Sequence, residues 1–251
     1  MKIATWNVNG IRAREAQVLA LVERERPDVL CLQEIKAPPA RVPASLCELG
    51  GYWCLWHGET AYSGVALLVR RDGAAAAARP AFAHPPFDHE TRIATTEVGG
   101  LVVASVYVPN GGKDYAAKLR FLEAMERWAA EAVAAGRPVV VAGDLNVART
   151  DMDVHPKERK VGAIGQRPDE RALVEAMLGH GLVDVGRAVD PDNAGLFTYW
   201  APWRNLRQRN IGWRIDYVVA SAPLAATVGR CAVLADFGTS DHAPVVAELG
   251  G

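Results

Sequence analysis

The chain has 251 residues, half of them apolar and 23% charged, with 28 basic and 29 acidic side chains and a formal net charge of −1. These values are ordinary for a soluble globular protein, and the length suits one large domain or two small ones. They exclude a membrane-spanning chain, because no apolar run approaches the ~18 residues that a span needs. The near-neutral charge also argues against a generic nucleic-acid binder, which is usually strongly basic.

Ten short runs, many of them rich in β-branched residues and bounded by Gly, Pro or Asp, are typical of strands. In chain order they are Lys2–Val8, Val29–Gln33, Tyr52–His57, Val65–Arg70, Arg92–Val98, Leu101–Val108, Pro138–Gly143, Ile215–Ala220, Arg230–Leu234 and Pro244–Leu249.

Three stretches with apolar residues at helical spacing interrupt these strands: Ile11–Arg26, Tyr115–Ala135 and Asp169–Leu178. Each stops at a proline or glycine, as helices do. Strands outnumber helices by about three to one, which favours two packed sheets with outer helices over a doubly wound sheet. Since no linker of useful length divides the chain, residues 1–251 are expected to form a single domain.

Two long irregular segments, Asp151–Gln166 and Pro191–Asn210, are rich in Arg, Lys or Trp. Loops of this size in a compact domain tend to be functional or disordered, and the composition favours function. The alanine run Ala74–Ala78 is expected to be a helix end or a solvated turn without a function.

The cysteines and the first residues indicate the compartment. Four cysteines without C-x-x-C spacing read as free thiols of a reducing cytoplasm, and the chain starts without the features of a signal peptide. We therefore expect a cytoplasmic protein.

Hard oxygen ligands follow or precede several of the predicted strands. The residues are Asn7, Glu34, Asp144, Asn146 and Asp241. A carboxylate next to an apolar strand is costly to bury unless it is paired, hydrogen-bonded or bound to a metal. We therefore expect these positions to converge on one pocket.

Oxygen-only ligands suit Mg²⁺ or Mn²⁺ better than zinc. His242, beside Asp241, is a candidate acid or base, and Asp216 is a candidate to orient it. A metal, amide donors and a carboxylate–imidazole pair are the parts needed to hydrolyse a phosphate ester. Each residue also has a plainer interpretation: Asn7 as a cap, Asp144 and Asn146 as turn residues, and His242 as a structural histidine.

Seven sequence blocks resemble the exonuclease III family of abasic-site endonucleases, in family order and over nearly the whole chain. They are Trp6–Arg12, Leu32–Lys36, Tyr62–Ala66, Tyr107–Gly111, Gly143–Ala148, Gly212–Tyr217 and Ser240–Pro244. The resemblance implies an α/β fold, a four-layered, DNase I-like sandwich of two mixed sheets packed face to face with helices outside. It also implies Mg²⁺-dependent incision 5′ to abasic sites in duplex DNA, with 3′→5′ exonuclease and 3′-phosphodiesterase activity; Mn²⁺ is expected to substitute for Mg²⁺.

The same resemblance assigns roles to individual residues. Glu34 is the principal metal ligand, with Asn7 and Asp241 nearby, and the catalytic or phosphate-contacting residues are Tyr107, Asn110, Asp144, Asn146, Asp216 and His242. Whether His242 or Asp144 activates the water, and whether one or two metals act, stays open. Asn9 stands where some relatives carry Asp, which weakens the case for a second metal ligand there.

A pocket for the flipped-out abasic sugar is the feature that separates this family from other members of its superfamily. Tyr199, Trp213, Ile215 and Trp200 match its positions. An abasic residue presents no base, so selection must come from pocket size and apolarity. Trp203 is interpreted as core packing.

Four arginines lie among these aromatic residues, namely Arg204, Arg207, Arg209 and Arg214, as binding of duplex DNA with an extruded nucleotide requires. Lys113 is a candidate contact to the opposing strand or the minor groove. The basic run Lys157–Arg167 is either a second contact or a solvated face. The net charge of −1 is therefore a sum over an acidic metal centre and basic loops.

The expected partner is double-stranded DNA with abasic sites or blocked 3′ ends, with no membrane and no obligate protein partner, and the expected state is a monomer. Two rival functions share much of the motif set: a phosphatase or phosphodiesterase for inositol phosphates or lipid headgroups, and a DNA-binding protein with little catalysis. The basic aromatic loop argues against the first, and the intact polar set argues against the second.

Overall fold

Two mixed β-sheets pack face to face in the computed structural model, which describes residues 1–72 and 78–250. Most of the run Ala74–Ala78, with its expected turn or helix end, lies outside the described residues. The six-stranded sheets have the orders β11-β12-β1-β2-β4-β3 and β5-β6-β7-β8-β10-β9. In each sheet one pair is parallel, β1 with β2 and β7 with β8, and the other pairs are antiparallel.

The strands of the first sheet are β1 (Lys2–Asn7), β2 (Val29–Gln33), β3 (Tyr52–His57), β4 (Val65–Arg70), β11 (Val228–Val233) and β12 (Val245–Leu249). Those of the second are β5 (Phe82–Ala83), β6 (Ile93–Val98), β7 (Leu101–Tyr107), β8 (Val139–Asp144), β9 (Leu182–Asp184) and β10 (Asp216–Ser221).

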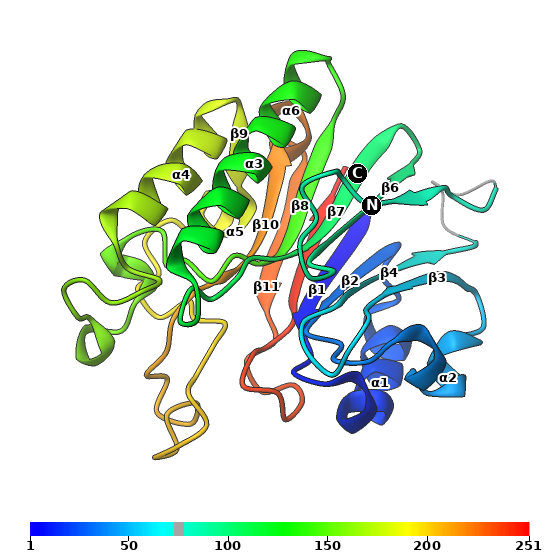
Figure 1. Ribbon diagram of the computed structural model, residues 1–251, viewed down its shortest axis with the longest axis horizontal. Helices are drawn as coiled ribbons and strands as arrows, with labels where there is room; N and C mark the ends of the chain where they lie inside the picture. The colour runs from blue at the N-terminus through cyan, green and yellow to red at the C-terminus, as the bar shows by residue number, and fades with distance from the viewer. Residues whose placement is uncertain (73–77, 251) are drawn as a thin grey trace.

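Helices cover the outer face of each sheet, which makes the sandwich four-layered (Figure 1). The α-helices are α1 (Glu15–Glu25), α2 (Ala44–Cys47), α3 (Tyr115–Ala134), α4 (Pro168–Gly179), α5 (Val185–Val189) and α6 (Ala222–Ala225). Short 3₁₀ turns are η1 (Ile11–Arg14), η2 (Pro39–Arg41), η3 (Asp151–Asp153) and η4 (Pro156–Glu158). α1 and α2 pack on the first sheet, and α3 and α4 on the second. The predicted sandwich is confirmed.

Side chains alternate between the two faces of each strand, and this explains how the strands pack against both the other sheet and the helices. Ile3 and Cys31 point between the sheets and Trp6 and Leu32 toward the helices, so each buried strand carries apolar residues on both faces. A buried polar link joins the sheets: Gln33 Nε2 of β2 donates to Ser105 Oγ of β7 at 3.1 Å. Because these buried polar side chains are hydrogen-bonded to each other, they stabilise the contact between the sheets next to the ends of β1 and β2.

Sequence periodicity missed the shortest elements. β5 and β9 have two and three residues, and α2, α5 and α6 have four or five, too few for a period to register. The expected helix Ile11–Arg26 divides into η1 and α1. No described helix is both long and apolar enough to cross a membrane.

Candidate active site

Strand direction brings the polar strand ends to one edge of the sandwich. β1 and β2 are parallel, so Asn7 and Glu34 emerge side by side. Asp144, at the end of β8, pairs in register with Asp216, at the start of the antiparallel β10. His242 precedes β12, which begins at this edge because β12 is antiparallel to β1. The predicted convergence therefore follows from topology.

Asn7 links the two sheets through its side-chain amide. Its Nδ2 donates to Glu34 Oε1 at 2.8 Å and to Asp144 Oδ2 at 2.9 Å. Its Oδ1 accepts from the Asn9 backbone N–H at 3.0 Å, so the expected turn role is also present. Asn7 thus holds two carboxylates in place and is not only a local cap.

Two of the residues that meet at this edge, Glu34 and Asn146, have left-handed backbone conformations. Glu34 has φ 49° and Asn146 has φ 51°. Non-glycine residues rarely adopt this region, and such strain is concentrated at functional sites. β8 reaches Asp144 through Gly143, where a Cβ atom would overlap the Val106 carbonyl, so this position requires glycine.

The Glu34 carboxylate also pairs with a lysine. Lys36 Nζ lies 2.7 Å from Glu34 Oε2 and 2.6 Å from Asn9 Oδ1, and Asn9 Nδ2 donates to Asp241 Oδ1 at 2.9 Å. Burial opposes ionisation of Glu34, but the hydrogen bonds from Asn7 and Lys36 outweigh it and lower its pKa. Ligand atoms of Glu34, Asp144 and His242 lie within 4.8 Å of one another. An ionised carboxylate with further oxygen donors fits a divalent cation.

His242 and Asp216 form a buried ion pair. His242 Nδ1 lies 2.9 Å from Asp216 Oδ2, and Nε2 lies 3.9 Å from Asp144 Oδ2. Burial alone would lower the pKa of His242, but Asp216 and then Asp144 outweigh it and raise the pKa to about 10. At neutral pH the imidazole is therefore charged, with Nδ1–H donated to Asp216.

Asp144 is almost fully buried, and its pKa is raised. Burial is the largest cause; the His242 charge opposes it, while the carboxylates of Asp216 and Glu34 reinforce it. Asn146 supports the ionised form, since its N–H donates to Oδ1 at 2.8 Å and its Nδ2 to Oδ2 at 3.1 Å. A carboxyl group with a raised pKa can exchange a proton near neutral pH.

Tyr107 presents its phenol to the same cavity from the end of β7. The guanidinium of the buried Arg92 lies 4.6 Å from its ring centroid and donates to Glu90 at 2.7 Å. Burial and then the Glu34 and Asp144 charges raise the pKa of Tyr107, so the hydroxyl stays protonated and can donate a hydrogen bond.

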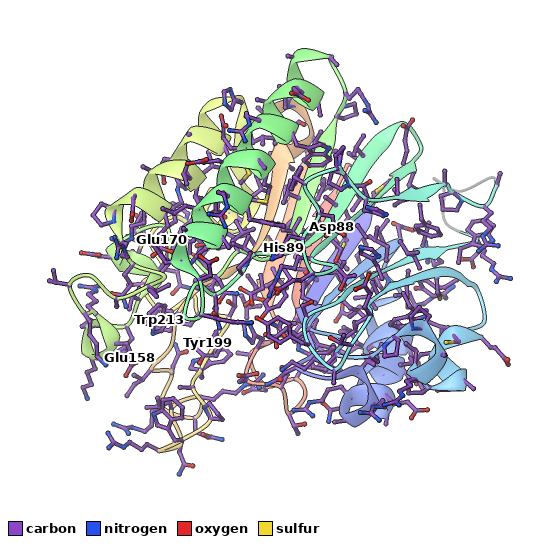
Figure 2. All side chains as sticks on the ribbon, viewed as in Figure 1. Asp88, His89, Glu158, Glu170, Tyr199 and Trp213 are labelled. Atoms are coloured by element: carbon purple, nitrogen blue, oxygen red, sulfur yellow. The ribbon has the colours of Figure 1, made fainter. Side chains whose placement is uncertain are left out.

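An apolar wall completes the cavity, which has a volume of about 370 Å³. Tyr199, Trp213 and Ile215 form it and pack together with Val154. Tyr199 and Trp213 pair through a β-bridge and lie next to each other in Figure 2. The Tyr199 ring centroid lies 4.8 Å from that of His242, so the wall directly adjoins the polar centre. Apart from Asn7, which links Glu34 and Asp144 from below, the polar residues expected at the metal or phosphate all line this cavity: Glu34, Tyr107, Asn110, Asp144, Asn146, Asp241 and His242, with Asp216 behind His242.

Trp200 does not join this wall. It is 2% exposed and packs with Phe197, Leu206 and Ile211, while Trp203, interpreted from the sequence as core, is 59% exposed. A strand-like segment places neighbouring side chains on opposite faces, so Tyr199 faces the cavity and Trp200 the interior.

The four arginines predicted to face DNA also differ in their exposure and partners. Arg214 is buried and paired with Asp153 and Asp184 at 2.7 Å each, so the interpretation of Arg214 as part of a DNA-facing set is wrong. Arg207 donates to the carbonyls of Ala235, Phe237 and Ser240 and so holds the loop before Asp241. Arg204 and Arg209 are exposed. Lys113 is exposed and lines a neighbouring hollow with Arg92 and Asn110, outside the main cavity.

Three charged residues that support the site were not predicted: Lys36, Arg92 and Lys118. Lys118 Nζ donates to the Asn146 carbonyl at 2.7 Å and forms a buried ion pair with Glu170. The sequence feature that could have identified Lys118 is its position on the apolar face of α3, one turn before Leu122. Arg92 carried no local signal for its role, because the aromatic rings that it contacts, Tyr62 and Tyr107, come from other segments.

Comparison with known proteins agrees with this geometry. The model of the endonuclease/exonuclease/phosphatase family matches residues 4–242. The chain belongs to this family. Its predicted assignment to the exonuclease III group of AP endonucleases, and hence to the nuclease hydrolases, is confirmed by the relatives it matches.

This family member is 34% identical to an exodeoxyribonuclease of Bacillus subtilis (strain 168), with 98% of each chain covered. It is 32% identical to Recombination repair protein 1 of Drosophila melanogaster, where 98% of the chain spans only 36% of that longer protein.

Solved structures show the same DNase I-like sandwich. An AP endonuclease from Archaeoglobus fulgidus has a TM-score of 0.89 at 29% identity, with 99% of each chain covered. The 3′ phosphatase NExo from Neisseria, bound to a product DNA hairpin, has a TM-score of 0.89 at 31% identity over the full length of both chains.

Proposed function

We propose that this chain hydrolyses the phosphodiester 5′ to an abasic site in duplex DNA in a Mg²⁺-dependent reaction, and that it also processes 3′ ends as a 3′→5′ exonuclease and 3′-phosphodiesterase. One observation carries the proposal: the wall of Tyr199, Trp213 and Ile215 shares a cavity with the Glu34–Asp144–His242 centre. The polar residues can act on a phosphate of the DNA backbone, and the apolar wall beside them suits the adjoining sugar that carries no base.

Glu34 would hold the metal ion, with Asn7 and Asp241 nearby. The lowered pKa of Glu34 supports this choice, since an ionised carboxylate that lines the cavity is a suitable ligand for a divalent cation. Mg²⁺ supplies positive charge to the phosphate when bound, and Mn²⁺ is expected to substitute. Asn9 is neutral and donates to Asp241, which favours a single metal.

Asp144 is the proposed general base. Its raised pKa and buried position suit proton transfer, whereas Asp216 raises the pKa of His242 and favours the protonated imidazole. Asp144 takes a proton from water, the water oxygen bonds to phosphorus, and the bond from phosphorus to O3′ of the preceding nucleotide breaks. The departing O3′ takes up a proton from solvent water. The products are a 3′-hydroxyl and a 5′-deoxyribose phosphate.

His242 stabilises the negative charge that develops on the phosphate, and Asp216 keeps the imidazole oriented and protonated. Tyr107 and Asn110 donate to phosphate oxygens from the facing side of the cavity. Asn146 holds Asp144, through the two bonds described above, and adjoins the phosphate. Pre-positioned donors of this kind need no reorganisation during the reaction.

Duplex DNA is proposed to lie across the exposed loop that carries Trp203, Arg204 and Arg209, with Lys113 on the other side of the cavity. An exposed aromatic ring in the same loop as two exposed arginines offers both stacking and phosphate contact. The names of the relatives support DNA as substrate: one is an exodeoxyribonuclease and another a 3′ phosphatase bound to a DNA hairpin. We also propose that the protein acts as a cytoplasmic monomer without an obligate protein partner.

The test is incision of a duplex that carries one tetrahydrofuran abasic analogue, with and without EDTA, resolved on a sequencing gel so that nicking and 3′ resection appear separately. We expect a metal-dependent nick directly 5′ to the analogue, and a drop in turnover of at least ~10²-fold for Glu34→Ala and for His242→Ala. Cutting of intact duplex at the same rate would overturn abasic specificity. Phosphate release from inositol phosphates or lipid headgroups without DNA incision would favour the rival phosphatase function.

A further inference from the structure

A second group of three metal-ligating side chains lies outside the catalytic cavity. In the described part of the chain, His57, His84 and Asp88 bring ligand atoms within 4.8 Å of one another, and none of the three lines the cavity. His57 ends β3, whereas His84 and Asp88 lie between β5 and β6, where Figure 2 labels Asp88. The proposed nuclease reaction uses none of them.

The two imidazoles meet at one carboxylate oxygen. Asp88 Oδ2 lies 2.6 Å from His57 Nε2 and 3.9 Å from His84 Nδ1. A tetrahedral zinc ion with ligands at about 2.0–2.1 Å requires roughly 3.3 Å between ligand atoms. The two distances lie on either side of this value. Because an ion lies in the plane of each imidazole that binds it, the exposed His84 ring would rotate out of its stack on His57 when the ion binds.

The carboxylate is already oriented. Asp88 Oδ1 accepts the backbone N–H groups of Arg92 at 2.8 Å and of Ile93 at 3.1 Å, which leaves Oδ2 directed at the histidines. Fixed outer hydrogen bonds of this kind orient metal ligands. The Asp88 side chain is 9% exposed and that of His57 19%, so the two inner ligands are partly shielded from water.

A simple hydrogen-bonded pair would account for His57 and Asp88 but not for His84. The His84 ring stacks on His57, with centroids 4.9 Å apart and planes 14° from parallel, and turns Nδ1 toward the same oxygen. Two imidazole nitrogens and one carboxylate oxygen are a donor set of borderline softness, which suits Zn²⁺ and its neighbours; Mg²⁺ prefers oxygen ligands alone.

We propose that His57 Nε2, His84 Nδ1 and Asp88 Oδ2 form a binding site for a transition-metal dication of the Zn²⁺ class, with water in the fourth position. The ion would tie the end of β3 to the segment before β6. Because Asp88 Oδ1 also holds the backbone of Arg92, whose guanidinium stacks on Tyr107, the site would brace one side of the catalytic cavity. The site offers two nitrogen ligands and one oxygen ligand, and it shares no residue with the catalytic centre.

The experiment is a Zn²⁺ titration of the metal-stripped full chain against a chromophoric zinc chelator, with millimolar Mg²⁺ present to occupy the catalytic centre. His84→Ala removes an imidazole whose side chain is 60% exposed and should leave the fold intact. His89→Ala is the matched control, because His89 is equally exposed, one residue from Asp88 and outside the group.

We expect the wild type and His89→Ala to bind one more equivalent than His84→Ala, or to bind it at least ~10-fold more tightly. With Co²⁺ in place of Zn²⁺, the same two proteins should show the visible absorption of a tetrahedral ion, and His84→Ala should not. Equal Zn²⁺ affinity in wild type and His84→Ala, or identical Co²⁺ spectra, would overturn the site. Neither readout depends on nuclease activity, so the outcome is separate from that of the proposed function.

Discussion

His242 and Asp216 form a 2.9 Å ion pair that connects the two sheets at their shared edge. Asp216 begins β10 of the second sheet, and His242 precedes β12 of the first. Both side chains are buried, so water cannot stabilise the charge of one of them if the other is removed. The pair thus couples the protonation of the imidazole to the packing of the sandwich.

Replacing Asp216 with Asn should lower the pKa of His242, since the carboxylate that stabilises the imidazolium is lost. We expect kcat on the abasic duplex to fall at least ~10²-fold and the alkaline limb of the pH–rate profile to move to lower pH. Asp236→Asn, a change at an exposed carboxylate, is the control and should leave the profile unchanged. An unshifted profile in Asp216→Asn would remove the ion pair from the mechanism.

The same pair predicts how stability depends on pH. The pKa of His242 is raised from 6.5 to about 10 on folding, so its contribution to the free energy of unfolding is fully present below pH 6.5 and is lost as the pH rises through about 10. Urea unfolding at pH 7 and at pH 10 should show a larger loss of stability for the wild type than for His242→Gln. Equal losses in the two proteins would contradict the assigned charge.

Trp200 and Trp203 should behave in opposite ways although they are three residues apart. Trp200→Ala removes a ring that is 2% exposed and should lower the free energy of unfolding by about 3–5 kcal/mol. Trp203→Ala removes a ring that is 59% exposed, so stability should hold while affinity for duplex DNA falls. Thermal unfolding and fluorescence anisotropy with a labelled duplex, run on both variants, separate the two roles.

Arg214 and Arg209 make a second contrasting pair. Arg214→Met leaves the buried carboxylates of Asp153 and Asp184 without their main cation and should destabilise the fold by about 3–5 kcal/mol. Arg209→Ala should leave stability unchanged and reduce the slope of log affinity against log salt by about 1. If Arg209→Ala instead unfolded the protein and left the slope unchanged, the assignment of Arg209 to the DNA surface would be wrong.

Sequence reasoning recovered the long strands and the three main helices, because a period of two registers over five residues and the helical period registers over the eleven or more residues of α1, α3 and α4. It also identified Glu34, Asp144 and His242, since carboxylates or imidazoles beside apolar strands need a partner wherever the strands lead. It could not separate Trp200 from Trp203 or Arg209 from Arg214. Each pair shares a residue type and a loop, and differs only in which side chains from distant segments surround it.

By itself the sequence determined the order of the elements, the candidate oxygen ligands and the family, because these depend on local patterns and on motifs along the chain. Only the tertiary structure decided that Asn7 joins two carboxylates, that Arg92 supports Tyr107 and that His57, His84 and Asp88 meet. Those contacts depend on strand order and on the direction of each β-strand, which bring residues from distant segments together. No local pattern in the sequence specifies these distances.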